Sequence, residues 1–483
     1  MTAPELSFPG LVVAHLIPWL MGGALAYALL KPRGKWNGFI IAGHGYLLGV
    51  LITTVLMKAS GLLGFAVQFW PLLALQLLLA MAIMAWSIMR QTESQIVQAP
   101  TVMAVWQVGV VVCLLLLIAA RYYLIANELL LRPLFPWDAW MNWAPEPVTW
   151  FFHGGELVPF VSPKEWLEAG GKSLVYTHGA GLAWKNPDTV PLIQLWAMIG
   201  LGTSDHPLIY LSWLFVVIAL GSALYGHLRL SGLGIPSAML ASYALLSLPL
   251  VNVHVALAGY ADIWVAAAFG GAVMALYAWQ EQGELGYAII GLLLAVLCTL
   301  LKVPGLVLGG ILLVLLGIYA LRLGRTPIMW TLGLTGLVVI YALLVGIDIP
   351  LGNLGRITLS NREIVLPYLG RSELAYHSIH REMALTLFTM WNWNLLWYVF
   401  FTAGPLLLCL RRTGLIPSLD LMALYLALLF MFVTYFFTYR YQFVQDFTQI
   451  NRALMYTVPV IVFSLAIRIY RGFFCPRTGV IIS

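Results

Sequence analysis

The sequence has few charged residues. Asp, Glu, Lys and Arg make up only 9% of its 483 residues, whereas soluble domains carry about 25%. This shortage extends along the whole chain and excludes a soluble globular protein. Apolar windows of about 20 residues recur throughout, and each is long enough to cross a hydrocarbon core of about 30 Å. We therefore expect an all-α polytopic membrane protein, because a membrane barrel would show short alternating segments instead.

Cysteine is also scarce. The four cysteines form no CxxC pair, so the sequence indicates neither a metal site nor a disulfide framework. No basic cluster is interleaved with aromatic residues outside the membrane-flanking loops, so the formal net charge of +6 predicts no nucleic-acid partner. The first apolar run lacks a basic segment before it, and we expect a retained span with a translocated N-terminus.

Thirteen spans are predicted from the apolar windows and oriented by the Lys and Arg of short loops. The cluster Lys31, Arg33 and Lys35 is the strongest signal and places the first short loop in the cytoplasm, which puts the C-terminus inside. Lys and Arg exceed Asp and Glu on the predicted inner side only. The predicted spans are 9–30, 36–57, 61–89, 101–126, 205–228, 235–254, 260–280, 285–301, 304–322, 327–349, 384–410, 417–438 and 453–470.

The predicted topology leaves two long polar loops on the outer side, 127–188 and 350–383. Residues 189–202 are too short to span and read as a juxtamembrane or re-entrant helix, which needs protein or water around its ends. We expect 1–100 to be three additional N-terminal spans and 101–483 to be the core.

One carboxylate stands where the apolar spans give way to the first outer loop. Asp138 lies between Trp137 and Trp140, with Trp143 following. Ionisable groups near a membrane core are usually functional, so Asp138 is a candidate catalytic base. Two other readings stay open: an interfacial Asp can cap a helix, and tryptophans gather at membrane interfaces in any case.

Four further charged residues are predicted to face outward at span ends. Lys302 interrupts an apolar run and reads either as a snorkelling lysine or as a cation for a phosphate. Arg452 has the same two readings, and Arg suits bidentate phosphate contacts. Asp262 opens a span and can be a helix N-terminal acid. For Asp188, capping of the following helix is preferred to catalysis.

The chain resembles the GT-C superfamily of integral-membrane glycosyltransferases, specifically bacterial members that use polyprenyl-phosphate-linked sugars. The resemblance rests on Trp137-Asp138-Ala-Trp140-Met-Asn-Trp143 after a long span, Asn186-Pro-Asp188-Thr-Val-Pro191 before a juxtamembrane helix, Gly259-Tyr-Ala-Asp262 opening a span, and Asn451-Arg452-Ala-Leu-Met-Tyr-Thr-Val-Pro459 opening the last one. Lys302 stands where related sequences carry a Lys-Asn-Glu-Gly type motif, but this chain has Lys-Val-Pro-Gly and lacks the acidic residue.

The resemblance implies a GT-C type helix bundle that transfers a sugar, with inversion, from a polyprenyl-phosphate donor to a glycan, lipid or protein acceptor on the periplasmic face of the bacterial inner membrane. Asp138 would be the base. Lys302 and Arg452 would bind the donor phosphate, with Arg381 and Arg371 in reserve. Trp137, Trp140 and Trp143 would stack on sugar or form an interface belt. A divalent cation shared by Asp138 and a second carboxylate, Asp188 or Asp262, stays open.

Three rival functions are weighed against this one. A lipid-linked sugar transporter or flippase would place its polar residues at the midplane of inverted repeats, and the sequence shows neither feature. An O-antigen ligase or polymerase would use outer-face cations as well, but the Trp-Asp-Ala-Trp and Asn-Pro-Asp segments favour the glycosyltransferase. A structural scaffold leaves Lys302 and the loop 127–188 unexplained.

Overall fold

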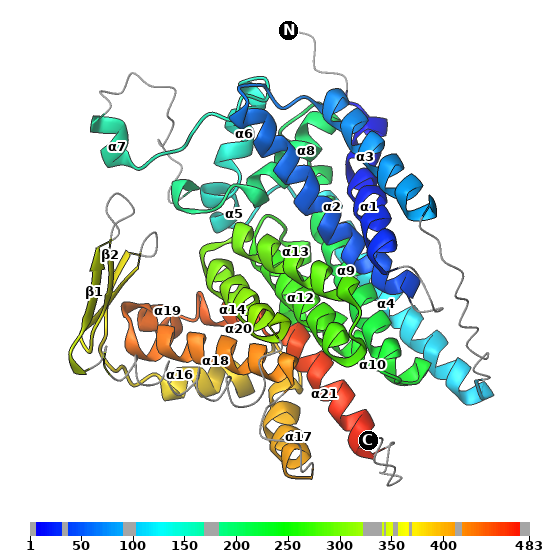
Figure 1. Ribbon diagram of the computed structural model, residues 1–483, viewed down its shortest axis with the longest axis vertical. Coiled ribbons are helices and arrows are strands. Elements are labelled where there is room, and N and C mark those ends of the chain that lie inside the picture. The colour runs from blue at the N-terminus through cyan, green and yellow to red at the C-terminus, as the bar shows by residue number, and fades with distance from the viewer. Residues whose placement is uncertain are drawn as a thin grey trace.

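The computed structural model is mainly helical (Figure 1) and describes residues 6–30, 37–89, 103–168, 183–321, 341, 344–350, 356–366, 370–410 and 418–473. Its helices are α1 (Phe8–Leu30), α2 (Asn37–Leu62), α3 (Phe69–Met89), α4 (Val105–Leu131), α5 (Trp137–Asn142), α6 (Pro145–Phe152), α7 (Pro163–Glu168), α8 (Thr189–Leu201), α9 (Leu211–Leu230), α10 (Ile235–Leu246), α11 (Pro249–Ala256), α12 (Asp262–Gln282), α13 (Leu285–Leu301), α14 (Val303–Ala320), α16 (His380–Ala384), α17 (Leu396–Leu410), α18 (Leu419–Phe437), α19 (Gln442–Gln445), α20 (Ile450–Met455) and α21 (Val458–Phe473). Short turns precede α8 (η1, Ala183–Lys185), α9 (η2, Pro207–Tyr210) and α19 (η5, Tyr439–Tyr441), and a π-helical turn (η4, Leu385–Thr389) follows α16.

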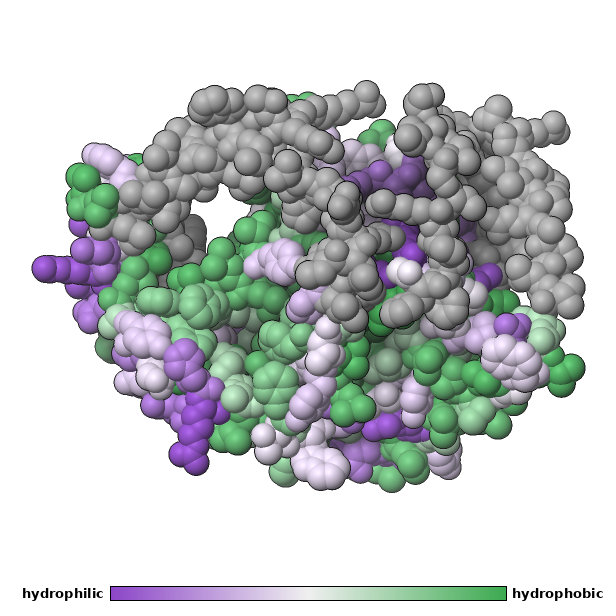
Figure 2. All heavy atoms as spheres, turned by 90° about the horizontal axis from the view of Figure 1, so that it is seen from below, coloured by the Kyte–Doolittle hydropathy of each residue, from purple (hydrophilic) through white to green (hydrophobic). Residues whose placement is uncertain are grey.

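Eight helices within the described ranges are long and apolar enough to cross a membrane, or nine if α10 and α11, which are bent by 60°, form one span. This confirms a helical polytopic membrane protein. The surface agrees with it, because apolar side chains cover much of the described face in Figure 2, with hydrophilic groups at its left edge, on the side of the small sheet in Figure 1, and in smaller groups elsewhere. The count of thirteen spans stays a prediction.

Besides 235–254, which is divided into α10 and α11, two predicted spans differ from the structure where it describes them. The span 327–349 lies mostly outside the described residues, and its end, 347–349, belongs to a strand. The span 384–410 is divided into α16, η4 and α17. Asn394, between η4 and α17, has a φ of +48°, a left-handed conformation that ends a helix and that Asn tolerates better than most residues.

The centre of the bundle is α12, which is buried along nearly its whole length. Its small residues, Ala266–Ala268 with Gly270 and Gly271, let neighbouring helices approach closely. A Cβ on Gly270 would lie 2.7 Å from the Cβ of Pro459 at the start of α21. Because α12 contacts α9, α13, α14, α18, α20 and α21, its first residue, Asp262, lies where segments far apart in the sequence meet.

The N-terminal helices belong to the same packed unit. A Cβ on Gly49 of α2 would lie 1.7 Å from the carbonyl oxygen of Pro18 in α1, so only glycine allows this helix crossing. Helix α2 also packs on α9, and α1 on α8 and α13. A large hydrophobic core therefore runs from α1 to α21, and a smaller second core joins α1, α2, α3 and α8. The division at residue 100 stays a prediction.

A small sheet that the sequence did not predict begins at the end of the predicted span 327–349 and continues into the second predicted outer loop. Four strands, β1 (Ile347–Pro350), β2 (Arg356–Leu359), β3 (Glu363–Leu366) and β4 (Gly370–Glu373), form an antiparallel meander in chain order. Asp348 of β1 pairs with Thr358 of β2, and Ile364 of β3 with Ser372 of β4. The sheet stands to one side of the bundle (Figure 1).

Candidate active site

Asp138 lies in the first turn of α5, the short helix that follows α4. The N-cap of α5 is Pro136, so Asp138 is not a helix cap. Asn142, one turn further along, donates from Nδ2 to Oδ1 of Asp138 at 2.8 Å. Arg452 of α20 donates from Nη1 to Oδ2 at 2.6 Å. Both carboxylate oxygens are thus held, while 26% of the side chain stays exposed.

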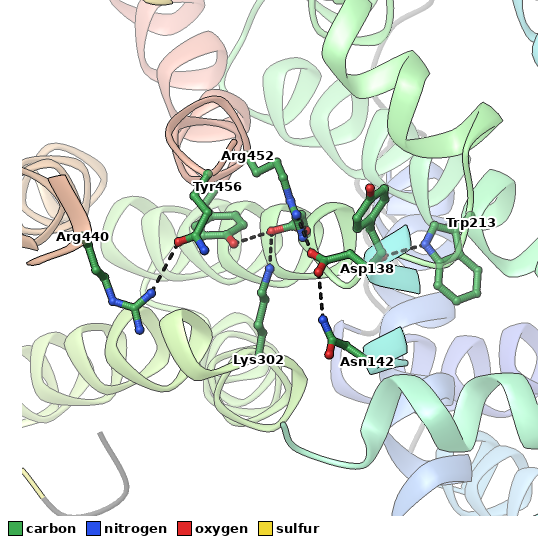
Figure 3. Close-up of polar contacts among 10 residues, drawn as sticks. Asp138, Asn142, Trp213, Lys302, Arg440, Arg452 and Tyr456 are labelled. Atoms are coloured by element: carbon green, nitrogen blue, oxygen red, sulfur yellow. Dashed lines mark hydrogen bonds and ion pairs between the residues drawn. The ribbon is translucent and has the colours of Figure 1, made fainter. Parts of the chain in front are cut away.

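Asp262, the first residue of α12, is fully buried and is the acceptor of three side chains (Figure 3). Lys302 donates from Nζ to Oδ1 at 2.7 Å. Arg452 reaches Oδ2 with both Nε at 3.0 Å and Nη2 at 2.7 Å. The hydroxyl of Tyr456 donates to Oδ1 at 2.5 Å. The position also suits the positive end of the α12 dipole, as expected for a first-turn acid, but the ion pairs are what allow a buried charge.

Arg452 joins the two carboxylates. Its guanidinium also lies 4.4 Å from the ring centroid of Tyr260, a cation–π contact. Burial alone would lower the pKa of Arg452, but Asp262 and then Asp138 outweigh it, and the pKa is raised above its ordinary value. The arginine is therefore charged at any physiological pH.

The turn before α12 fixes α5 against the cluster. Gly259 has a φ of +109°, and a Cβ there would lie 2.6 Å from the Cβ of Ala139 on α5 and 2.8 Å from Leu134. Only glycine satisfies both the conformation and this close approach. The carbonyl oxygen of Tyr260 accepts a hydrogen bond from Trp213 Nε1 at 2.7 Å. The Gly259–Tyr260 turn thus positions both Asp138 and the ring beneath Arg452.

Lys302 is the residue at which one apolar run becomes two helices. Its backbone is extended (φ −164°, ψ 155°), α13 ends before it, and α14 begins after it with Pro304 in the first turn. Its side chain is 17% exposed, and its ammonium meets Asp262 rather than the surface. The snorkelling interpretation therefore does not hold.

The cluster is balanced in charge but keeps unused donors. Two cations, Lys302 and Arg452, face two carboxylates, Asp138 and Asp262. Of the five N–H groups of an arginine, the contacts above use three, one each on Nε, Nη1 and Nη2. Of the three on a lysine, they use one. Both cations keep 17% of their side-chain surface exposed.

The two reserve arginines do not join this cluster. Arg371 lies on β4, is 66% exposed and pairs with Glu363 at 2.6 Å and with Glu373 at 3.9 Å. Arg381 is exposed on α16. The sequence placed both arginines on the outer side through the predicted topology alone. The topology does not determine which outer loops meet in one site.

The prediction that Asp188 caps α8 is confirmed for the position of the residue but not for its side chain. The residue does occupy the N-cap position of α8, but its side chain makes no capping hydrogen bond. Instead it pairs with Lys58 of α2, Oδ2 to Nζ at 2.7 Å. Asp262, the other candidate second carboxylate, does lie beside Asp138, with Arg452 between them.

The three tryptophans have different environments. Trp137 is 63% exposed and Trp140 is 47% exposed, so both remain available to a ligand or to the membrane interface. Trp143 is 1% exposed and belongs to the hydrophobic core, which corrects its proposed sugar-stacking role.

Sequence reasoning missed Asn142, Tyr260 and Tyr456, although each lies within a segment that carried the resemblance. Two signals were available, since Asn142 follows Asp138 by four residues and Tyr456 follows Arg452 by four, which is one helical turn. Tyr260 had no such signal. Arg440 stands apart from the cluster in Figure 3, with its Nη1 3.4 Å from Gln449 Oε1.

The arrangement does not suit a divalent cation shared by the two carboxylates. Arg452 occupies the place between Asp138 and Asp262 that a bridging metal would need. Among the residues that the structure describes, no group of three or more His, Cys, Asp and Glu side chains could hold a metal ion.

Comparison of the chain with protein-family models, with curated proteins and with solved structures found no match. The function must therefore be argued from the cluster itself.

Proposed function

We propose that the protein is an inverting glycosyltransferase that moves a sugar from a polyprenyl-phosphate donor to a glycan acceptor, lipid-linked or part of the cell envelope, on the periplasmic face of the bacterial inner membrane. The observation that carries the proposal is the contact of Asp138 with Arg452. Arg452 and Lys302 both bind Asp262, so the two cations lie side by side next to Asp138. A partly exposed carboxylate next to two partly exposed cations suits the transfer of a sugar from a phosphate.

The cations suit the leaving group. When the bond between the anomeric carbon and the phosphate oxygen breaks, the polyprenyl phosphate departs with the electron pair and gains negative charge. Fixed donors in a low-dielectric site stabilise such charge strongly. The unused N–H groups of Arg452 and Lys302 supply them, and a guanidinium matches the geometry of phosphate oxygens.

Asp138 suits the role of base. The acceptor hydroxyl forms the new bond to the anomeric carbon, and its proton passes to the carboxylate. In the structure, Asp138 is engaged by Arg452. A donor phosphate that binds Arg452 would compete for that contact and leave Asn142 to hold the carboxylate. Donor binding would in this way activate the base.

The position of the cluster supports an enzyme over a carrier. Asp262 opens α12, Lys302 precedes α14, and Asp138 and Arg452 belong to the short helices α5 and α20. These are helix ends, whereas transporters hold their substrate sites near the midplane. The orientation that places these ends outside, with the N-terminus out and the C-terminus in, rests on the loop charges.

Donor binding provides the direct test. The protein in lipid nanodiscs is titrated with decaprenyl phosphate, and transfer is followed with decaprenyl-phosphate hexoses and cell-envelope lipid extract. We expect Lys302→Gln and Arg452→Lys each to weaken decaprenyl phosphate binding at least tenfold. Arg452→Lys keeps the buried charge, so it separates phosphate recognition from folding.

The matched control is Arg471→Gln, because Arg471 is also a partly buried, ion-paired arginine but meets Glu281 at the far end of α12. It should bind the lipid normally. Unchanged affinity in both site variants would refute the phosphate assignment. Mass spectrometry of envelope glycans from cells with and without the gene would identify the sugar and the acceptor.

A further inference from the structure

A second candidate site lies beside the ionic cluster. A cavity of about 340 Å³ opens between the 133–148 segment and the 204–210 turn that leads into α9. Its volume is at the lower end of the range of about 300–1,000 Å³ for small-molecule sites. Its polar and aromatic lining is Trp140, Ser204, Asp205, His206 and Tyr210, and the rest of the wall is apolar.

The cavity faces away from the cations. Trp140 follows Asp138 by two residues on α5, and two residues correspond to about 200° of rotation around a helix. Asp138 meets Arg452 on one side, and Trp140 lines the cavity on the other. A molecule in the cavity therefore does not occupy the phosphate position, although both sites share the same short helix.

The lining offers both kinds of hydrogen-bonding group beside an aromatic face. Nδ1 of His206 accepts a hydrogen bond from the backbone N–H of Leu208 at 3.2 Å, so a neutral His206 carries its proton on Nε2 and can donate. Asp205 is exposed and acts as an acceptor, and the Ser204 hydroxyl can do either. The indole of Trp140 is nearly half exposed.

The chemistry points to a carbohydrate. With His206 neutral, the lining residues carry one negative charge, from Asp205, which disfavours a phosphate or another anion. A hydrocarbon chain would leave Asp205, Ser204 and His206 unpaired beside it. A sugar ring presents hydroxyls to such groups and a C–H face to an aromatic ring, and sites of this kind pair an apolar wall with a few placed polar groups.

We propose that this cavity binds a sugar unit of the glycan acceptor, one that is not the reacting unit. This inference rests on the proposed function. The far side of α5 cannot present a hydroxyl to Asp138, so a sugar held there anchors the acceptor while another unit reaches the base. Acceptors long enough to fill both places would gain affinity, and shorter ones would not.

The test is direct binding of free sugars, with no reaction. Saturation-transfer difference NMR is recorded on the protein in lipid nanodiscs, since maltoside detergents would themselves supply a sugar. The probes are the methyl glycosides of glucose, galactose, mannose and N-acetylglucosamine. We expect saturation transfer to at least one probe in the wild type, and a loss of at least fivefold in Trp140→Ala and in Asp205→Asn.

The control is Trp70→Ala, because Trp70 is an exposed tryptophan, 66% accessible, that lies on α3 and does not line the cavity. It should leave the signal unchanged. Asp205→Asn changes an exposed side chain and should fold normally. It therefore still tests the inference if Trp140→Ala fails to fold. The absence of transfer to every probe, or wild-type signals in both variants, would overturn the inference. Because decaprenyl phosphate binding is measured separately at Arg452 and Lys302, failure here leaves the proposed function standing.

Discussion

Arg452 lies 2.6 Å from Asp138, although 314 residues separate them in the chain. The same guanidinium contacts Asp262 at 2.7 Å, so one arginine holds together two carboxylates from two other segments. These contacts bring Asp138, Asp262 and Arg452, which lie in three separate segments of the sequence, into one site. They also mean that Asp138 and the proposed phosphate compete for the same cation.

Replacement of Asp138 by asparagine should abolish transfer without weakening donor binding. Asparagine keeps an acceptor for Arg452 but cannot take the proton of the acceptor hydroxyl, and loss of a general base lowers the rate by about 10²–10⁴-fold. Single-turnover transfer and decaprenyl phosphate titration measure the two effects. Asp446→Asn, at an exposed aspartate that hydrogen-bonds to Thr448, should retain wild-type rates. A fully active Asp138→Asn protein would remove Asp138 as the base.

Asn142 should act as a positioning residue for Asp138. Its amide hydrogen-bonds Oδ1 of that carboxylate at 2.8 Å, and a hydrogen bond to a charged group contributes about 1.5–3 kcal/mol. Asn142→Ala should therefore lower kcat by roughly tenfold or more and leave the affinity for decaprenyl phosphate unchanged, with partial recovery in Asn142→Gln. A purely structural role would instead lower stability with kcat per folded protein unaltered, which thermal unfolding would reveal.

Asp262 should be the residue on which the stability of the cluster depends most. Asp262→Asn would leave Lys302 and Arg452 with an uncompensated charge in a buried place, and breaking one partner of such a group costs about 3–5 kcal/mol. The double variant Asp262→Asn with Lys302→Met removes one unpaired cation, so it should recover part of that loss. Unfolding in a graded detergent mixture measures both.

A matched surface change gives the baseline for that comparison. Asp348→Asn alters a half-exposed aspartate of β1 that lies 3.8 Å from Arg356, and exposed pairs contribute at most about 1 kcal/mol. If Asp262→Asn proved no more destabilising than Asp348→Asn, the buried ion pairs would not be what holds α12, α14 and α20 together.

The sequence was sufficient for the helical membrane class and for four members of the cluster. Asp138, Asp262, Lys302 and Arg452 could be selected because each is a charge at the edge of an apolar run, where charge is costly. The sequence does not show which of the outer-face charges converge, because that depends on how α5, α12, α14 and α20 pack. Arg371 and Arg381 looked equivalent to Arg452 for this reason.

Local conformation explains two other differences. Trp143 resembled its neighbours Trp137 and Trp140, but the turn after α5 carries its side chain into the core. The strands between 347 and 373 are only four residues each, too short for an alternating pattern to stand out in a polar loop.

Glu146 should make stability depend on pH. It lies on α6 in the first outer loop and is 4% exposed. Burial, and then the nearby charge of Asp188, raise its pKa from 4.5 to about 9, while Lys58 opposes the change. The unfolded chain loses this proton near pH 4.5 and the folded protein near pH 9. Between these values folding takes up a proton, so the contribution of Glu146 to stability falls as the pH rises from about 4.5 to about 9.

Glu146→Gln isolates this effect, because glutamine has nearly the same shape and does not titrate. The melting temperature of the variant, relative to the wild type, should rise steadily between pH 5 and pH 9. Glu156→Gln, at an exposed position of the same loop, should show a difference that does not change with pH. The interpretation fails if the two substitutions give parallel pH profiles, since Glu146 would then be ionised in the folded protein with its charge already compensated.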